Sequence, residues 1–166
     1  RYQEGCMQKV TILCTGKLKE KFYLDAAAEY AKRLSRFCKL EICELPEERL
    51  PEDPSPAQIE AALSKEADAV RAKLPTSCLL IAMCVEGKER SSEELARYLA
   101  DSAAQGASHI VFLIGSSFGM HESLKRQAAL RLSMSPMTFP HHLLRVMLLE
   151  QIYRAYQINA GSRYHK

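Results

Sequence analysis

The sequence lacks any apolar stretch long enough to cross a membrane. Its longest apolar run, Cys78 to Val85, is far shorter than the roughly 20 residues that a membrane-spanning helix needs. The first residues also lack the order of a signal peptide, which is a basic segment followed by an apolar one. We therefore expect a protein without a membrane segment.

A strong excess of either charge is also missing. The chain has 23 lysines and arginines against 20 aspartates and glutamates, a formal net charge of +3, and no basic tail. Proteins that bind nucleic acid through a general basic surface carry a larger excess. If this protein binds RNA, the contacts must therefore be local.

Cysteine pairs with CxxC spacing are absent. The six cysteines stand at positions 6, 14, 38, 43, 78 and 84. Four of them lie within strand-like apolar runs, which is typical of reduced and buried thiols. We expect a cytoplasmic protein without disulfides.

What is present fits one globular domain. With 166 residues, 47% of them hydrophobic, the chain can bury one core and is too short to divide comfortably into two. The first residue is Arg1, and we interpret Arg1 to Cys6 as an extension before a natural start at Met7. The predicted domain is therefore 7–166.

Strand-like and helix-like segments alternate along this domain. Strands are predicted at Lys9 to Thr15, Cys38 to Cys43, Cys78 to Val85, His109 to Ile114 and Leu130 to Met134. Helices are predicted at about Lys19 to Phe37, Pro56 to Leu74, Ser91 to Gly106, Glu122 to Ala128 and Pro140 to Ile158. The second strand alternates as an edge strand does, whereas the third and fourth are apolar throughout, which indicates central strands. This order predicts an α/β fold with a largely parallel sheet and helices on both faces.

In such a sheet, ligands bind beyond the carboxyl ends of the strands. The segments there are Met83 to Lys88, Gly115 to Gly119 and Ser133 to Phe139. The first two contain little more than a turn needs, and neither has the GxGxxG spacing that holds a pyrophosphate. The third, extended to Pro140, contains two prolines and two methionines where short polar residues are usual. It could wrap an adenine, or be a loop held in the core by its methionines.

The last predicted helix is apolar on almost every side, whereas a stripe of about 100° covers a single core. We interpret the remaining apolar surface as an interface, most simply that of a symmetric homodimer. On this helix His141 and Arg145 share a face, while Arg154 lies about half a turn round and roughly 13 Å further along. If all three act on a substrate, a composite site from two protomers is the simpler geometry.

The chain ends in Arg163, Tyr164, His165 and Lys166. By composition this polar end is a frayed tail. The same residues combine cations with a phenol and an imidazole, which could stack on a base, hold phosphate and transfer a proton. The residues alone leave both interpretations open.

Several motifs together resemble the ribosomal RNA large subunit methyltransferase H family. The specific ones are Ile114-Gly115 with Gly119, Leu132 to His141, Leu144 to Tyr156, and the terminal Tyr164-His165-Lys166. Weaker matches, which would not suffice alone, are Thr15-Gly16-Lys17, Val85 to Lys88 and Ser91 to Ala96. The similarity extends over the whole chain from Met7.

The resemblance implies a single-domain SPOUT fold with a deep trefoil knot in its C-terminal half. It also implies a homodimer through the C-terminal helix and methyl transfer from S-adenosylmethionine to N3 of a pseudouridine in 23S rRNA. The implied substrate is the large subunit or the 70S ribosome, which suits the low net charge because a free hairpin would bind weakly. In this family the donor lies in the knot, which maps onto Met83, Gly115, Met134, Ser135, Pro136, Met137, Thr138 and Phe139.

The implied chemistry needs no metal, because the sulfonium of the donor is already activated. Positioning can supply roughly 7 to 11 kcal/mol, and a positioned base typically adds about 10² to 10⁴ in rate. We hypothesise that Tyr164 and His165 close over the base, with His165 as the proton acceptor. His141 is the rival base. Arg154 is expected to hold the phosphate or the imide oxygen as negative charge develops.

Two residues depart from the family pattern. Ser116 stands where the family often has a second glycine, and Cys84 stands where many members have Asp. Neither position is expected to be essential for donor binding. Two other functions stay open: a SPOUT methyltransferase for another RNA such as tRNA, which should lack the Tyr164-His165-Lys166 ending, and a non-catalytic dimeric nucleotide-binding module.

Overall fold

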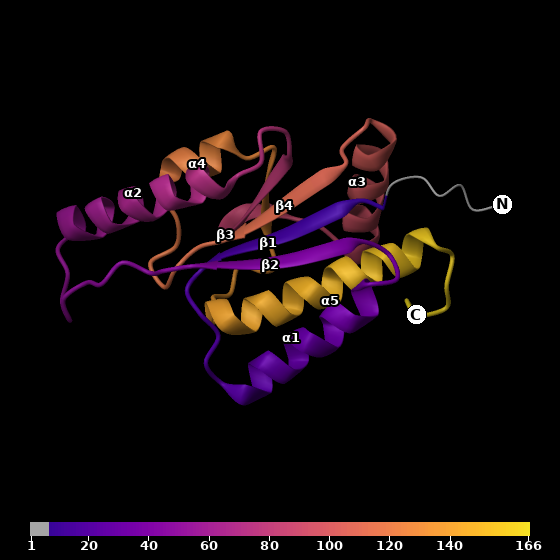
Figure 1. The fold of residues 1–166 in the computed structure, drawn as a ribbon, viewed down its shortest axis with the longest axis horizontal. Coiled ribbons are helices and arrows are strands. Elements are labelled where there is room, and N and C mark those ends of the chain that lie inside the picture. The colour runs from indigo at the N-terminus through magenta and orange to yellow at the C-terminus, as the bar shows by residue number, and fades with distance from the viewer. Residues whose placement is uncertain (1–6) are drawn as a thin grey trace.

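Five strands and five helices alternate along residues 7–166, which a computed structural model describes (Figure 1). The strands are β1 (Lys9–Thr15), β2 (Lys39–Leu45), β3 (Leu79–Glu89), β4 (His109–Ile114) and β5 (Leu130–Ser133). The helices are α1 (Lys21–Leu34), α2 (Pro56–Lys73), α3 (Ser92–Ala104), α4 (Glu122–Gln127) and α5 (His141–Asn159). The predicted extension from Arg1 to Cys6 lies outside the described residues.

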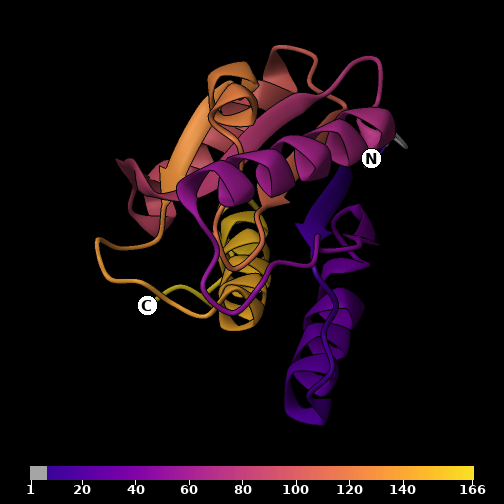
Figure 2. The same cartoon turned by 90° about the vertical axis from the view of Figure 1, so that its left-hand side faces the viewer.

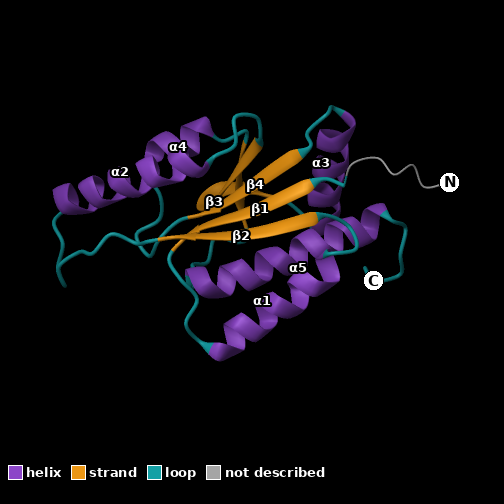
Figure 3. Cartoon of the chain, viewed as in Figure 1, coloured by secondary structure: helices purple, strands orange, loops and turns teal. Residues whose placement is uncertain are grey.

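All pairs in the sheet are parallel, and the strand order is β2-β1-β4-β3-β5. The predicted places of β2 at an edge and of β3 and β4 inside the sheet are confirmed. The helices cover both faces, with α1, α3 and α5 on one side and α2 and α4 on the other (Figures 1 and 2). Figure 3 shows the sheet as the middle layer between them. The predicted α/β class is therefore confirmed, whereas the knot stays a prediction.

The core follows from the alternation of side chains along the strands. In β4, Ile110 and Phe112 pack towards α5, and Val111 and Leu113 pack towards α2. A strand with both faces covered needs apolar residues at every position, which explains the unbroken apolar runs.

Helix starts agree with the sequence where a local capping motif exists. Ser55 and Ser91 cap α2 and α3, and each forms a reciprocal capping box with the residue three positions on. The prediction was wrong at α1, which begins at Lys21 and not near Lys19. The reason is tertiary, because the backbone N–H of Leu18 donates to Glu44 of β2 and holds this segment outside the helix.

Strand β3 is longer than predicted and continues from Val85 to Glu89. Its pairing with β5 is interrupted, because Leu132 of β5 pairs first with Met83 and then with Lys88. Residues 84–87 thus leave the ladder and return to it. The segment predicted as a strand exit is in fact an irregularity within β3.

The described cysteines, at positions 14, 38, 43, 78 and 84, are all free thiols. Burial raises the pKa of Cys14 to about 12 and that of Cys38 to about 11, so both stay protonated at neutral pH. Among the described residues, no helix is both long and apolar enough to cross a bilayer.

Gly87 marks the point where β3 returns to β5. A Cβ atom there would lie 2.8 Å from the carbonyl carbon of Arg131, and backbone cannot yield as a flexible side chain can. We predict that Gly87→Ala lowers the free energy of unfolding by about 2 kcal/mol, as overpacking typically does. Urea titration measures this, with Lys88→Ala at the exposed neighbouring position as control. Equal stability of the two variants would contradict the close approach.

Candidate functional site

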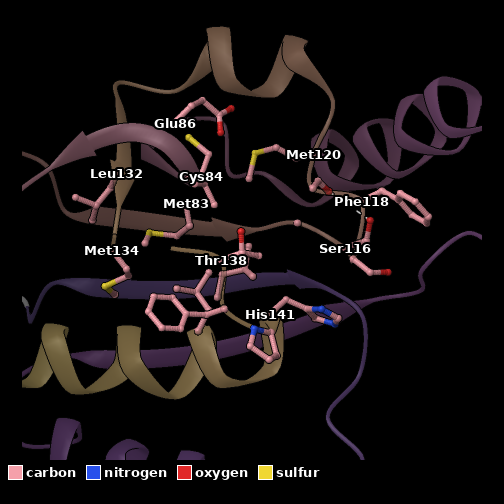
Figure 4. A pocket seen from close by; sticks show the side chains of 18 of the residues that line it. Met83, Cys84, Glu86, Ser116, Phe118, Met120, Leu132, Met134, Thr138 and His141 are labelled. Carbon is pink, nitrogen blue, oxygen red and sulfur yellow. Dashed lines mark hydrogen bonds between the residues drawn. The ribbon is translucent and has the colours of Figure 1, made fainter. Parts of the chain in front are cut away.

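A cavity of about 600 Å³ opens at the carboxyl edge of the sheet (Figure 4). It is lined by residues 83–86 of β3, by the turn 114–120 after β4, and by the loop after β5 up to His141. The three segments predicted from the sequence therefore meet around one space. Seven of the predicted donor residues line it: Met83, Gly115, Met134, Ser135, Met137, Thr138 and Phe139. Pro136 is exposed and does not line it.

The turn after β4 is tight because Ser116 and Gly119 exchange two backbone hydrogen bonds, of 2.9 and 2.8 Å. Gly119 has a φ of 88°, a conformation that glycine adopts without strain. A Cβ atom on Gly115 would collide with the Gly119 backbone. Both glycines are thus required by the geometry of the turn, and the residues of this turn line the cavity.

Glu66 of α2 holds this turn in place through its side chain. It accepts hydrogen bonds from the Ser116 hydroxyl (2.8 Å) and from the backbone N–H of Glu48 (2.9 Å). Glu66 is only 7% exposed, and burial raises the pKa of its carboxyl. The sequence analysis missed Glu66, although a signal existed: it falls on the apolar stripe of α2 between Leu63 and Val70. A buried carboxyl on such a stripe needs partners.

Because the pKa of Glu66 is raised, the folded protein keeps this proton at pH values where the unfolded chain, with a pKa near 4.5, has lost it. The stabilising contribution is therefore complete below pH 4.5 and is lost as pH rises through the folded pKa. We predict that Glu66→Gln gains stability relative to the wild type as pH rises from 4.5 towards neutral.

Urea titrations across this pH range measure the difference in unfolding free energy. The exposed Glu52→Gln controls for the loss of one negative charge. A difference between Glu66→Gln and the wild type that stays constant with pH would contradict the prediction.

The loop after β5 is organised by serines. Ser133 donates its hydroxyl hydrogen to the carbonyl of Ser135 (3.0 Å), and the N–H of Met137 donates to the Ser135 hydroxyl (3.0 Å). Met134 packs against the core, whereas Met137 is 72% exposed at the rim of the cavity. The loop thus combines both interpretations of its methionines, since one is tucked into the core and one is free to contact a ligand.

An ion pair borders the opposite side of the cavity. Lys125 of α4 pairs with Glu86, and both line the space together with Cys84. Burial, followed by the nearby Glu86 charge, raises the pKa of Cys84, so this residue presents a neutral thiol where many family members are expected to have Asp. Lys125 was not predicted, because it lies on a short helix without a recognisable motif.

His141 begins α5 and lines the cavity. Burial and the neighbouring His142 lower its pKa, so its imidazole is neutral at neutral pH and able to accept a proton. Arg145, one turn further, does not face the cavity. It is 3% exposed, pairs with Glu44 at 2.8 Å and donates to the carbonyl of Gly16 at 3.3 Å.

The other predicted catalytic residues form a separate cluster. Arg154 pairs with Glu150 at 2.8 Å, and the Tyr164 hydroxyl donates to the same carboxylate at 3.1 Å. His165 lies 3.1 Å from Arg154 through Nδ1 and 2.6 Å from Glu93 through Nε2. The tail is therefore folded onto α5 and α3 rather than frayed.

This cluster lies along the second half of α5, whereas His141 at the start of the same helix lines the cavity. His141 and Arg154 are separated by thirteen positions, or about 20 Å along a helix. One protomer therefore brings Arg154, Tyr164 and His165 together but keeps them away from His141 and the cavity. Within residues 7–166, no group of three or more His, Cys, Asp or Glu side chains could hold a metal ion.

Comparison of this chain with known proteins identifies the class of enzyme to which it belongs. The sequence model of the family described as predicted SPOUT methyltransferase matches residues 8–165, so the chain is a SPOUT methyltransferase. Two curated relatives are named ribosomal RNA large subunit methyltransferase H, from Streptococcus uberis and Bifidobacterium adolescentis. Each is 46% identical over 158 residues, which cover 95% of this chain and 99% of the relative. The chain belongs to the ribosomal RNA large subunit methyltransferase H family, as its C-terminal motifs predicted.

A solved structure supports the fold independently. The structure of a probable methylase family protein from Haemophilus influenzae superimposes with a TM-score of 0.52, at 13% identity, over 95% of this chain and 70% of that one. At this identity the likeness shows the fold alone.

Proposed function

We propose that the protein transfers a methyl group from S-adenosylmethionine to N3 of a pseudouridine in 23S rRNA. It would do so as a homodimer in the cytoplasm, on the large subunit or the 70S ribosome. The observation that carries this proposal is one cavity formed by the irregular part of β3 and by the segments that follow β4 and β5. Relatives named for methylation of large-subunit ribosomal RNA, at 46% identity over nearly the full chain, support the substrate class.

The residues around the cavity suit S-adenosylmethionine. Its volume of about 600 Å³ lies within the usual 300–1,000 Å³ for small-molecule sites. Met83, Met134 and Phe139 provide apolar contacts for an adenine, and the Gly115 turn allows close approach of backbone groups. When bound, the donor supplies an activated methyl on its sulfonium. The chain must then orient the target base and remove the proton from N3.

The separation of the two clusters along α5 supports a composite site. His141 lies at the cavity, whereas Arg154 lies about 20 Å further along the helix and contacts Tyr164 and His165 there. A second copy packed across α5 in the opposite direction would bring its tail cluster to the cavity of the first. Leu143, Val146, Met147 and Ile158 of α5 are only half-buried in one protomer, and a partner would cover them.

In this arrangement each residue keeps the role expected from the sequence. Arg154 holds the phosphate or the imide oxygen, and Tyr164 contacts the base. His165 accepts the N3 proton, with neutral His141 as the rival base. To do so, His165 must exchange its present contact with Glu93 or Arg154 for one with the base.

Donor binding and target choice can be tested separately. Calorimetry should show binding of S-adenosylhomocysteine, with affinity lowered more than about tenfold, or 1.4 kcal/mol, in Gly115→Ala. Gly106→Ala is the matched control, because its positive φ of 95° strains the backbone away from the cavity. Mass mapping of 23S rRNA should then locate the methyl group on a pseudouridine after incubation with ribosomes that lack the mark. Absence of donor binding would support the non-catalytic module, and methylation of tRNA alone would overturn the proposed target.

The composite site can be tested by mixing inactive chains. Homodimers of Gly115→Ala and of His165→Ala are each expected to be inactive. When the two chains are mixed in equal amounts and exchange at random, half of the dimers are heterodimers, and each heterodimer has one intact site of two. The mixture should therefore regain about a quarter of the wild-type rate. A mixture without activity would contradict a site shared between protomers, and an active His165→Ala homodimer would remove His165 from the mechanism.

A further inference from the structure

A second cavity lies beside the first, at the carboxyl ends of β1 and β2. It has a volume of about 620 Å³ and is lined by the turn after β1, the turn after β2 and the first residues of α5. His141 lines both cavities. The proposed methylation mechanism makes no use of this β1–β2 cavity, although the Thr15-Gly16-Lys17 motif leads into it.

Two lysines reach this cavity because of how the chain leaves β1. Leu18 is only 4% exposed, and its N–H donates to Glu44 at 2.9 Å, which pins an extended segment against the core. Successive side chains of an extended segment point to opposite sides. Burial of Leu18 therefore turns Lys17 and Lys19 outward, and both line the cavity.

The carboxylates that line the cavity have partners, whereas the lysines that line it have none among the described residues. Its three carboxylates all have partners: Glu44 pairs with Arg145, Glu20 lies 3.6 Å from His142, and Glu47 accepts from Ser117. Within residues 7–166, Lys17 and Lys19 form no ion pair. Lys17 and Lys19 are thus the exposed cations of the β1–β2 cavity that have no ion pair in the described part of the chain and are free to meet an anion.

The position of the cavity restricts what this anion is. S-adenosylmethionine carries no phosphate and has its own cavity, so the lysines are not needed for the donor. The RNA proposed as substrate is a polyanion that must reach the first cavity, and His141 is shared by both spaces. A nucleotide adjacent to the methylated base would therefore place its phosphate near Lys17 and Lys19.

We propose that the β1–β2 cavity binds a backbone phosphate of the RNA next to the methylated nucleotide, through Lys17 and Lys19. This proposal rests on the RNA substrate proposed above, and it adds the direction in which the RNA strand leaves the methylated nucleotide. With a net charge of only +3, the protein must bind RNA through local contacts, and two lysines without an ion pair in residues 7–166, beside the first cavity, can provide such contacts.

The test compares Lys17→Gln/Lys19→Gln with Lys65→Gln/Lys73→Gln. Both double variants remove two exposed charges, and the second pair lies on α2, on the opposite face of the sheet. Methylation of ribosomes lacking the mark is measured at several salt concentrations, with S-adenosylhomocysteine binding in parallel. The Lys17 and Lys19 variant should raise KM for ribosomes on the order of tenfold and flatten the salt dependence of log KM by about 0.7, the value for one lost phosphate contact on a single strand. Its kcat and its affinity for S-adenosylhomocysteine should stay within about twofold of the wild type.

Each outcome has a distinct meaning. The proposal is overturned if both double variants show the same KM and salt slope, or if the Lys17 and Lys19 variant lowers kcat without a change in KM. Loss of S-adenosylhomocysteine binding in that variant would also overturn it, because the lysines would then serve the donor cavity. Failure of the wild type to methylate ribosomal RNA would instead refute the proposed function, and the strand path with it.

Discussion

The parallel pairing of β4 with β1 and β3 determines where this chain can build a site. Parallel strands all end at the same edge, so the turns after β1, β4 and the first half of β3 emerge side by side. The strands themselves are apolar on both faces, and polar groups gather at that edge because the buried interior has no partners for them. The double pairing of Leu132 with Met83 and Lys88 adds the loop after β5 to the same place.

Two buried ionisable side chains, Glu66 and Arg145, determine how the loops at this edge are arranged. Glu66 and Arg145 are both almost fully buried, and each joins segments far apart in the sequence. Glu66 ties α2 to the turn after β4 through Ser116, and Arg145 ties α5 to β2 through Glu44. A buried carboxyl or guanidinium that lost its partners would be strongly unfavourable, so these contacts restrict the loops to one arrangement. Ser116, at a position where the resemblance leads us to expect glycine, adds a side-chain contact that glycine cannot make.

The predicted catalytic residues lie in two separate regions along helix α5. Its first residue faces both cavities, whereas its last turns hold the cluster of Arg154, Tyr164 and His165 around Glu150. Since a helix cannot bring its two ends together, we propose that a second protomer brings the tail cluster to the cavity. The donor, the RNA strand and the partner would then meet at the start of α5, with His141 at their junction.

Patterns within single segments were enough to predict the order of strands and helices, the edge and central strands, the caps at Ser55 and Ser91, and the three segments that line the cavity. The resemblance to the family then indicated seven individual residues of the cavity. The C-terminal motifs also indicated the family. These features depend on periodicity and local hydrogen bonds, which are determined by residues close together in the sequence. Only the tertiary structure decided the continuation of β3 past Val85, the anchoring by Glu66, the entry of Lys125 into the cavity, and the distance between His141 and the tail. The contact between Ser116 and Glu66, for example, joins positions 50 residues apart, and no local pattern states which distant residue a buried polar group will meet.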